Sequence, residues 1–187
     1  MVLHIKNMVC DRCITVVNQQ LEVLGFRIKS AVLGRVSIEP EPDETQLSKI
    51  RSALKLHGFE LLDEKRKQVV EQVKNVIIEM VHHTDAGEIK MNYSELISER
   101  LGKDYHYLSS LFSESEDITI EKYIISQKIE KVKELLEYGE LNLNQIALNM
   151  GYSSTAHLSA QFKNVTGITP SAFKSLKGKK RKALDII

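Results

Sequence analysis

Long apolar runs and cysteine are scarce in this chain of 187 residues, and each scarcity excludes a class of protein. No stretch approaches the roughly 18 consecutive apolar residues that a membrane-spanning helix needs. Residues 1–10 are too short and too polar for an export signal, so we expect a cytoplasmic protein that does not enter a membrane. The two cysteines, Cys10 and Cys13, are too few for a disulfide framework, and their spacing is typical of a metal or redox site.

The net charge of +1 conceals a strong separation of charge along the chain. Residues 85–150 carry 7 basic and 13 acidic groups, whereas residues 151–187 carry 7 basic groups and 1 acidic group. A segment of net charge −6 is therefore followed by one of net charge +6. Such a localised positive segment predicts a contact with a polyanion near the C-terminus.

Residues 1–64 alternate between patterns typical of strands and of helices. The predicted elements are, in order, a strand at residues 2–7, a helix from Cys13 to Gly25, a hairpin that turns at Gly34, a helix capped by Asp43 and ending at Gly58, and a short strand at residues 59–62. This βαββαβ order predicts an α+β, ferredoxin-like sandwich of one sheet and two helices.

From residue 65 onward the predicted secondary structure is purely helical. Residues 65–83 carry apolar side chains at helical spacing with neither glycine nor proline, and the rest of the chain holds a single proline, Pro170. We therefore place a domain boundary near Glu64, which divides the chain into residues 1–64 and 65–187. His82 and His83, at the end of the leading helix, are expected to be solvated.

Two stretches of the helical half repeat each other. Ile97, Ser98, Leu101 and Gly102 correspond to Ile146, Ala147, Met150 and Gly151 at an offset of 49. Leu108, Ser109, Phe112, Ile118, Thr119 and Tyr123 then correspond to Leu158, Ser159, Phe162, Ile168, Thr169 and Phe173 at an offset of 50. Each copy is a short helix, a turn that opens at glycine, and a second helix with an apolar face. This arrangement predicts two helix-turn-helix units.

The helical half resembles the AraC family of bacterial regulators. The second copy carries the resemblance, with I-A-L-N-M-G-Y-S-S at residues 146–154 and F-K-N-V-T-G-I-T-P-S-A-F-K at residues 162–174. The resemblance implies an all-α double helix-turn-helix domain that places the second helix of each copy in successive major grooves of double-stranded DNA. The residues that it implies at the DNA are Tyr105, His106, Ser109 and Ser110 in the first copy, and Ser154, Thr155, Ala156, Ser159, Ala160 and Lys163 in the second.

The DNA-facing positions depart from the pattern of that family. Ser110 and Ala160 stand where a base-reading arginine is common, and Ser113–Glu114 replaces a usual basic pair. A row of carboxylates that includes Glu114 and Glu116 is expected to face the DNA phosphates and to repel them. We therefore expect the first copy to contribute less to DNA affinity, and an A·T-rich site of modest specificity. Phosphate contacts would come from Lys163 and from the basic tail, for which a solvated, frayed terminus is a compatible interpretation. The tail residues are Lys174, Lys177, Lys179, Lys180, Arg181 and Lys182.

The sequence M-V-C-D-R-C at residues 8–13 lies between the first strand and the first helix of the predicted βαββαβ unit. In this position it resembles the heavy-metal-associated domain of copper chaperones and metal-pumping ATPases, and the resemblance extends over residues 1–64. It implies that Cys10 and Cys13 bind a soft metal ion such as Cu(I) as thiolates, with Met8 packed underneath. Asn7 replaces the usual glycine of that family. A domain with two reduced cysteines and no ligand is the alternative.

Taken together, these patterns predict a DNA-binding transcription regulator that responds to a soft metal ion. The alternative is a metal-trafficking or scaffold protein whose helix-turn-helix half lacks sequence-specific DNA binding, which the acidic first copy and the missing arginines favour. No nucleophile with an adjacent base and no phosphate-binding loop is recognisable, so we do not expect an enzyme. Because one chain carries two DNA-reading helices, a monomer could bind DNA, and the oligomeric state stays open.

Overall fold

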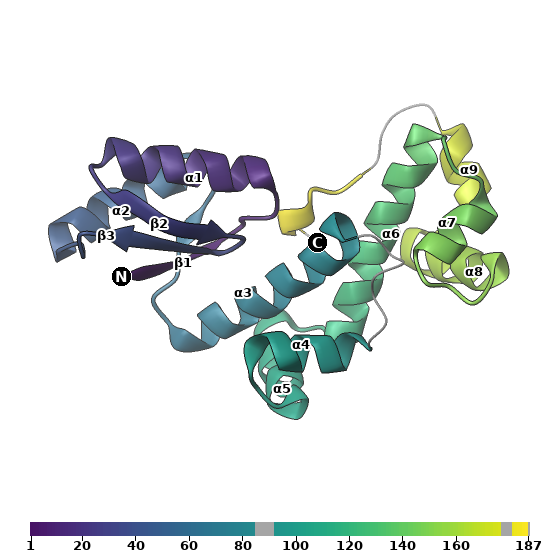
Figure 1. Cartoon of the computed structure of the whole chain (residues 1–187). Coiled ribbons are helices and arrows are strands. Elements are labelled where there is room, and N and C mark those ends of the chain that lie inside the picture. The colour runs from purple at the N-terminus through teal and green to yellow at the C-terminus, as the bar shows by residue number, and fades with distance from the viewer. Residues whose placement is uncertain (85–91, 177–180, 187) are drawn as a thin grey trace.

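The protein combines a small sheet with a larger set of helices. The computed structural model describes residues 1–84, 92–176 and 181–186 (Figure 1). Within these residues the buried apolar side chains form two separate clusters, one drawn from residues 3–61 and the other from residues 70–173. The prediction of a mixed fold, with an α/β part followed by a helical part, is confirmed. None of the described helices is long and apolar enough to span a membrane.

The N-terminal part follows the predicted order of strands and helices. Its elements are β1 (Val2–Lys6), α1 (Asp11–Val23), β2 (Arg27–Val32), β3 (Arg35–Glu39), α2 (Glu44–Leu56) and β4 (Glu60–Leu61). The four strands form an antiparallel sheet in the order β2-β3-β1-β4. Alternate residues of β1, Leu3 and Ile5, are buried in the core that α1 and α2 cover, whereas His4 and Lys6 point to the other face of the sheet.

Local signals explain where two of these elements begin and turn. Asp43 caps α2: its side chain accepts a hydrogen bond from the Gln46 backbone, and the Gln46 side chain accepts one from the Asp43 N–H. Gly34, in the turn between β2 and β3, has φ +71°, and a Cβ atom there would collide with the side chain of Asn75 in helix α3 (Lys65–Ile78). Glycine therefore permits both the tight turn and the close approach of the helical part.

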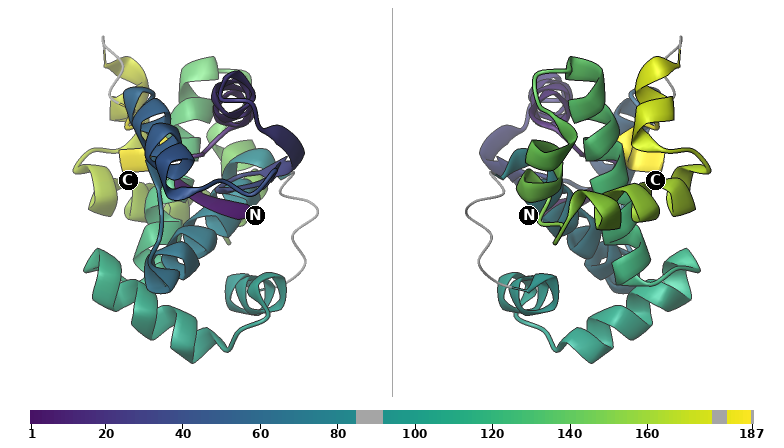
Figure 2. Two further views of the ribbon diagram at one scale, coloured as in Figure 1. Left: turned by 90° about the vertical axis from the view of Figure 1, so that its left-hand side faces the viewer. Right: turned by 90° about the vertical axis from the view of Figure 1, so that its right-hand side faces the viewer.

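The helical part is built around one long helix. Its elements are α3 (Lys65–Ile78), the π-helical turn η1 (Glu79–His83), α4 (Tyr93–Leu101), α5 (Tyr105–Glu116), α6 (Ile120–Tyr138), α7 (Leu143–Asn149), α8 (Thr155–Thr166), α9 (Pro170–Ser175) and the 3₁₀ turn η3 (Leu184–Ile186). Helix α6 runs between two groups of helices, α4 with α5 at one end and α7 with α8 and α9 at the other (Figures 1 and 2).

The end of the leading helix differs from the prediction. An uninterrupted helix was expected over residues 65–83, but the last five of these residues form a π turn. The prediction that His82 is solvated is wrong, because its Nε2–H donates to Gln127 Oε1 at 2.9 Å and the ring is largely covered by α6. His83 is exposed, but its Nε2–H donates to the carbonyl oxygen of Val9 at 3.0 Å. The two histidines thus link α3 to both parts of the molecule.

Candidate functional site

The two helix-turn-helix copies have the same frame. In each copy the first helix ends at a glycine in the left-handed conformation, Gly102 with φ +59° and Gly151 with φ +70°. The second helix then begins behind a side-chain cap: Asp104 accepts from the Tyr107 N–H at the start of α5, and Ser154 accepts from the His157 N–H at the start of α8. Helices α5 and α8 both comprise 12 residues, so the predicted recognition helices are confirmed as equivalent elements.

Matching aromatic contacts fix the two recognition helices to the core. Phe112 of α5 lies against Tyr123 of α6 with 5.5 Å between ring centroids, and Phe162 of α8 lies against Phe173 of α9 at 5.6 Å. Both phenylalanines are completely buried. Because the apolar face of each helix is fixed in this way, the opposite face is held toward solvent in a defined orientation.

The predicted DNA-facing residues lie at helical spacing on these solvent faces. On α5, His106 and Ser110 are exposed and Ser109 is half-buried. Tyr105 is half-buried against the core, and this burial raises the pKa of its hydroxyl. The residues on or next to α8 that are exposed are Ser154, Ala156, Ala160 and Lys163, and those that are partly covered are Thr155 and Ser159. Each set could therefore enter a groove as one surface.

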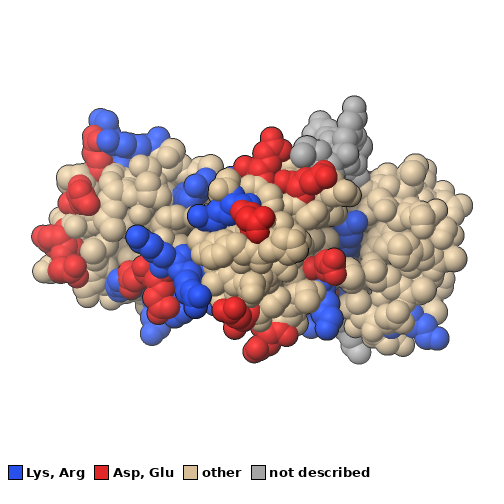
Figure 3. Space-filling model, turned by 90° about the horizontal axis from the view of Figure 1, so that it is seen from below, with Lys and Arg blue, Asp and Glu red and all other residues tan. Residues whose placement is uncertain are grey.

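Charge distinguishes the two recognition helices. Helix α5 contains no lysine or arginine, whereas α8 carries the exposed Lys163, whose counterpart in α5 is Ser113. Seen from below, few acidic or basic side chains lie over the end of the molecule that contains α7 and α8 (Figure 3). Helix α8 thus carries one lysine and no carboxylate, which suits the DNA backbone better than the acidic end of α5 does.

The expected row of carboxylates on the first copy is only partly present. Glu114 is exposed, as predicted. Glu116 instead forms an ion pair with Lys74 of α3, with 2.6 Å between Oε2 and Nζ, and both side chains are mostly covered. The prediction that Glu116 faces DNA phosphates is therefore wrong, because a contact distant in sequence turns its carboxylate inward.

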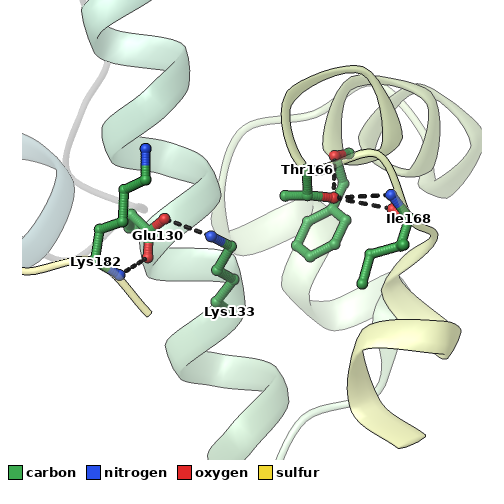
Figure 4. A network of polar contacts seen from close by, with 6 residues as sticks. Glu130, Lys133, Thr166, Ile168 and Lys182 are labelled. Atoms are coloured by element: carbon green, nitrogen blue, oxygen red, sulfur yellow. Dashed lines mark hydrogen bonds and ion pairs between the residues drawn. The ribbon is translucent and has the colours of Figure 1, made fainter. Parts of the chain in front are cut away.

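Part of the basic tail lies on α6. Arg181 pairs with Glu134 at 2.8 Å, and the backbone N–H of Lys182 donates to Glu130 Oε2 at 3.0 Å (Figure 4). Lys174 is exposed at the end of α9. The predicted phosphate contacts at Lys177, Lys179 and Lys180 lie outside the described residues. In this structure Arg181 is thus held by the carboxylate of Glu134.

Some residues that hold the two copies together carried no clear sequence signal. Lys128 of α6 donates to the Met150 carbonyl oxygen at 3.0 Å and lies 5.1 and 5.4 Å from the ring centroids of Tyr93 and Tyr152. It therefore joins the first helix of one copy to the turn of the other, beside a groove of about 430 Å³. Gln161 of α8 accepts a hydrogen bond from the Tyr152 hydroxyl at 2.7 Å.

The two thiols meet at the start of α1. Cys10 is the residue that precedes the helix, Cys13 lies in its first turn, and their Sγ atoms are 3.2 Å apart. Burial, together with the hydrogen bond to Cys10, raises the pKa of the Cys13 thiol. Met8 is fully buried in the adjacent core, where the sequence predicted it to pack. In the described part of the chain, no group of three or more histidine, cysteine or acidic side chains is placed to hold a metal ion.

Comparison with known proteins agrees with this geometry for the helical half. Residues 97–175 match the family described as a helix-turn-helix domain. The structure is similar to that of the C-terminal domain of AraT, a response regulator from Geobacillus stearothermophilus, with a TM-score of 0.51 and 22% identity over 64% of this chain and 94% of that one. The C-terminal part of the chain therefore contains a helix-turn-helix domain and shares the fold of that response-regulator domain.

Curated relatives match over the same part of the chain. The Msm operon regulatory protein of Streptococcus mutans is 30% identical over 108 residues, which are 58% of this chain and 36% of that protein. The uncharacterized HTH-type transcriptional regulator YtdP of Bacillus subtilis is 28% identical over 109 residues, 57% of this chain and 14% of the relative. The chain thus spans little more than a third of the first of these proteins and a smaller share of the second.

Proposed function

We propose that the protein is a cytoplasmic, DNA-binding transcription regulator that places α5 and α8 in successive major grooves of double-stranded DNA. One observation carries this proposal: both helices have one face locked in the core and the opposite face, formed by short polar side chains, exposed to solvent. The names of the curated relatives, an operon regulatory protein and an HTH-type transcriptional regulator, support it.

The side chains at the proposed DNA surface suit A·T-rich sequences. Lys163 would contact a phosphate, while the other residues of the surface would approach base edges. Serine and alanine reach thymine methyl groups or single acceptors, whereas guanine is usually read by an arginine or lysine that makes bidentate hydrogen bonds to the base. The proposed base-facing residues are Tyr105, His106, Ser109, Ser110, Ser154, Thr155, Ala156, Ser159 and Ala160.

Selection of bound duplexes from random DNA tests this function. We expect repeated rounds with the full chain to enrich an A·T-rich motif, with modest losses for single mismatches. Several invariant G·C pairs would contradict the assigned readout. Absence of any enrichment would contradict sequence-specific binding itself.

We further propose that residues 1–64 form a heavy-metal-associated, ferredoxin-like domain in which Cys10 and Cys13 bind a soft metal ion such as Cu(I). The donor set supports this, because two thiols lie 3.2 Å apart at a helix N-terminus and thiolates prefer soft ions. Anaerobic titration of Cu(I) against a competing chelator tests it. We expect Cys10→Ser and Cys13→Ser to abolish binding without unfolding the chain; equal affinity in the double variant would end the metal proposal.

A metal-trafficking or scaffold protein is the second candidate function. The absence of any basic residue from α5 favours it, because helices that enter DNA usually carry phosphate contacts. In this case the chain would bind Cu(I) through Cys10 and Cys13 but enrich no motif from random DNA. The two experiments above therefore separate the candidates.

A further inference from the structure

Residues 7–10 lead into the two thiols and form the thiol segment. Two contacts, one from α3 and one from the π turn η1 that follows it, hold this segment. The backbone N–H of Asn7 donates to Glu71 Oε1 of α3 at 3.1 Å. The carbonyl oxygen of Val9, which directly precedes Cys10, accepts from His83 Nε2 at 3.0 Å. A change in the path of this segment would therefore disturb two contacts with α3 and η1 at once.

Asn7 presents its N–H to Glu71 because of an unusual backbone conformation. Its φ of 72° is in the left-handed region, and its side-chain Nδ2 donates to the Gly58 carbonyl oxygen at 2.8 Å. A residue other than glycine adopts this conformation where its surroundings support it. The carboxylate of Glu71 is only 7% exposed, so its hydrogen bond from Asn7 offsets part of the cost of burying it. The backbone conformation of Asn7 and the burial of Glu71 thus both favour the hydrogen bond between these two residues.

The π turn directs neighbouring histidines to different parts of the molecule. His83 reaches the thiol segment, while His82 donates to Gln127 Oε1 inside the helical core. The amide of Gln127, a fully buried side chain, donates in turn to the Tyr123 hydroxyl at 3.0 Å. Tyr123 is the residue that packs on Phe112 of α5. Continuous contacts therefore run from the Val9 carbonyl to a recognition helix, through a type of turn that is frequent at functional sites.

Helix α3 also holds the same recognition helix directly. Lys74, one turn after Glu71, forms the covered ion pair with Glu116 near the end of α5. Glu116 of the first copy is thus paired with α3, the same helix that contacts the thiol segment through Glu71. One helix, α3, therefore contacts both the thiol segment and the helix α5.

We propose that Glu71 and His83 are positioning residues that couple the thiol pair to the DNA-binding half. A soft metal ion on Cys10 and Cys13 then changes the affinity for DNA, and DNA changes the affinity for the metal by the same factor, because the coupling of two bound ligands is reciprocal. This inference rests on the proposed function, and it adds the structural route by which the metal site regulates the DNA site.

The test measures both affinities on the full chain. One arm is the Kd of a fluorescein-labelled duplex, either the enriched motif or a random-sequence pool, by anisotropy with and without one equivalent of Cu(I). The other arm is the Kd of Cu(I) by chelator competition with and without saturating duplex. In the wild type we expect both values to change by the same factor, at least about fivefold.

Matched variants assign the effect to the two residues. Glu71→Ala and His83→Ala should reduce the coupling to less than about twofold, while Glu71→Gln, which keeps an acceptor oxygen, should retain most of it. The controls are Glu64→Ala and His57→Ala, which change an exposed glutamate that pairs with Lys67 and an exposed histidine at the end of α2. Hydrogen exchange of the wild type gives a second readout: Cu(I) should slow exchange in η1 and α6 as well as around the thiols.

The possible failures are distinguishable. If Cu(I) or DNA does not bind, the proposed function falls and this inference falls with it. If both bind with affinities that are independent of each other, or if Cu(I) slows exchange only in residues 1–64, the coupling is wrong while the proposed function stands. If the coupling survives in Glu71→Ala and His83→Ala, the assignment to these two residues is wrong.

Discussion

The two helix-turn-helix copies share their internal packing and differ on their surfaces. Phe112 on Tyr123 and Phe162 on Phe173 are the same contact made twice. Outside these cores, acidic Asp104, Glu114, Glu116 and Asp117 of the first copy correspond to uncharged Ser154, Asn164, Thr166 and Gly167 of the second, and Ser113 corresponds to Lys163. A common fold therefore does not imply an equal share in binding DNA.

Glu116 and Thr166 occupy equivalent positions in the two copies, but in the described part of the chain only Glu116 makes a polar contact outside its own copy. Glu116 pairs with Lys74 of α3. The Thr166 hydroxyl instead stays within its own copy, where it donates to the Phe162 carbonyl oxygen and accepts from the Ile168 N–H (Figure 4). The first copy is thus attached to the helix that contacts the N-terminal part. We infer that the first copy mainly connects the two halves and that the second supplies most of the DNA affinity.

The largest expected effect tests what the copies share. Phe112→Ala and Phe162→Ala each leave a cavity in the helical core, so each should lower the free energy of unfolding by about 3–5 kcal/mol. Denaturant unfolding monitored by circular dichroism measures both. Losses that differ by more than about 2 kcal/mol would show that the matching aromatic contacts are not equivalent in energy.

Acid should destabilise the junction ahead of the first copy. Burial lowers the pKa of His82 to about 4, although its hydrogen bond to Gln127 opposes this shift. Between that value and the ordinary 6.5 the unfolded chain binds the proton more readily, so stability falls as the pH drops from 6.5 to 4. The loss is about 3 kcal/mol. His82→Gln should reduce this loss of stability between pH 6.5 and 4. His157→Gln, which removes an exposed histidine of the second copy, is the control.

Variants at Lys163 and at Ser113, its counterpart in the first copy, test whether the two copies contribute unequally to DNA affinity. Lys163→Ala should weaken DNA binding about eightfold at 0.1 M salt and reduce the salt slope by about 1, as expected for one lost phosphate contact. Ser113→Ala should change neither, and Ser113→Lys should strengthen binding. Anisotropy titrations at several salt concentrations measure these changes. If Lys163→Ala and Ser113→Ala behave alike, Lys163 does not contact the backbone.

A conformational difference between the copies predicts a smaller gain. Asp117 has φ 56°, in the left-handed region that its counterpart Gly167 adopts with φ 80°. Asp117→Gly should therefore raise the free energy of unfolding by about 0.5–1 kcal/mol, and Gly167→Asp should lower it. Thermal and denaturant unfolding of both variants check the signs. A stabilising Gly167→Asp would refute the argument.

The smallest expected change concerns the remaining carboxylate on the first copy. Glu114 is exposed, so Glu114→Gln should raise DNA affinity about twofold by removing one repulsive charge. Glu116→Gln should give no such gain, because Lys74 already neutralises that carboxylate, and should cost some stability instead. Equal gains from the two variants would mean that Glu116 faces the DNA after all.

Much of the fold could be predicted from the sequence because its signals are local. The repeat placed glycines 102 and 151 at the two turns, and Asp43 caps α2 as the sequence predicted. Cys10 and Cys13 come together because three residues span less than one turn of helix. In these cases the interacting groups are close neighbours along the chain.

The contacts that join the two halves could not be predicted. Asn7 and Glu71 are 64 residues apart, and no periodic pattern marks the partner of a backbone N–H. The same holds for Lys74 with Glu116 and for Arg181 with Glu134, whose charges read as solvated or DNA-facing until the fold brings them together. The π turn likewise lacks glycine and proline, the usual signs of an interrupted helix.

Hydroxyl-radical footprinting of the enriched duplex tests the central claim most directly. Two recognition helices in successive major grooves should protect two stretches on one face of the DNA, about 10 base pairs apart. The stretch under α8 should survive to a higher salt concentration and should weaken selectively in Lys163→Ala. A single protected stretch, or two stretches that are lost together as salt increases, would contradict the account of two unequal DNA-binding copies.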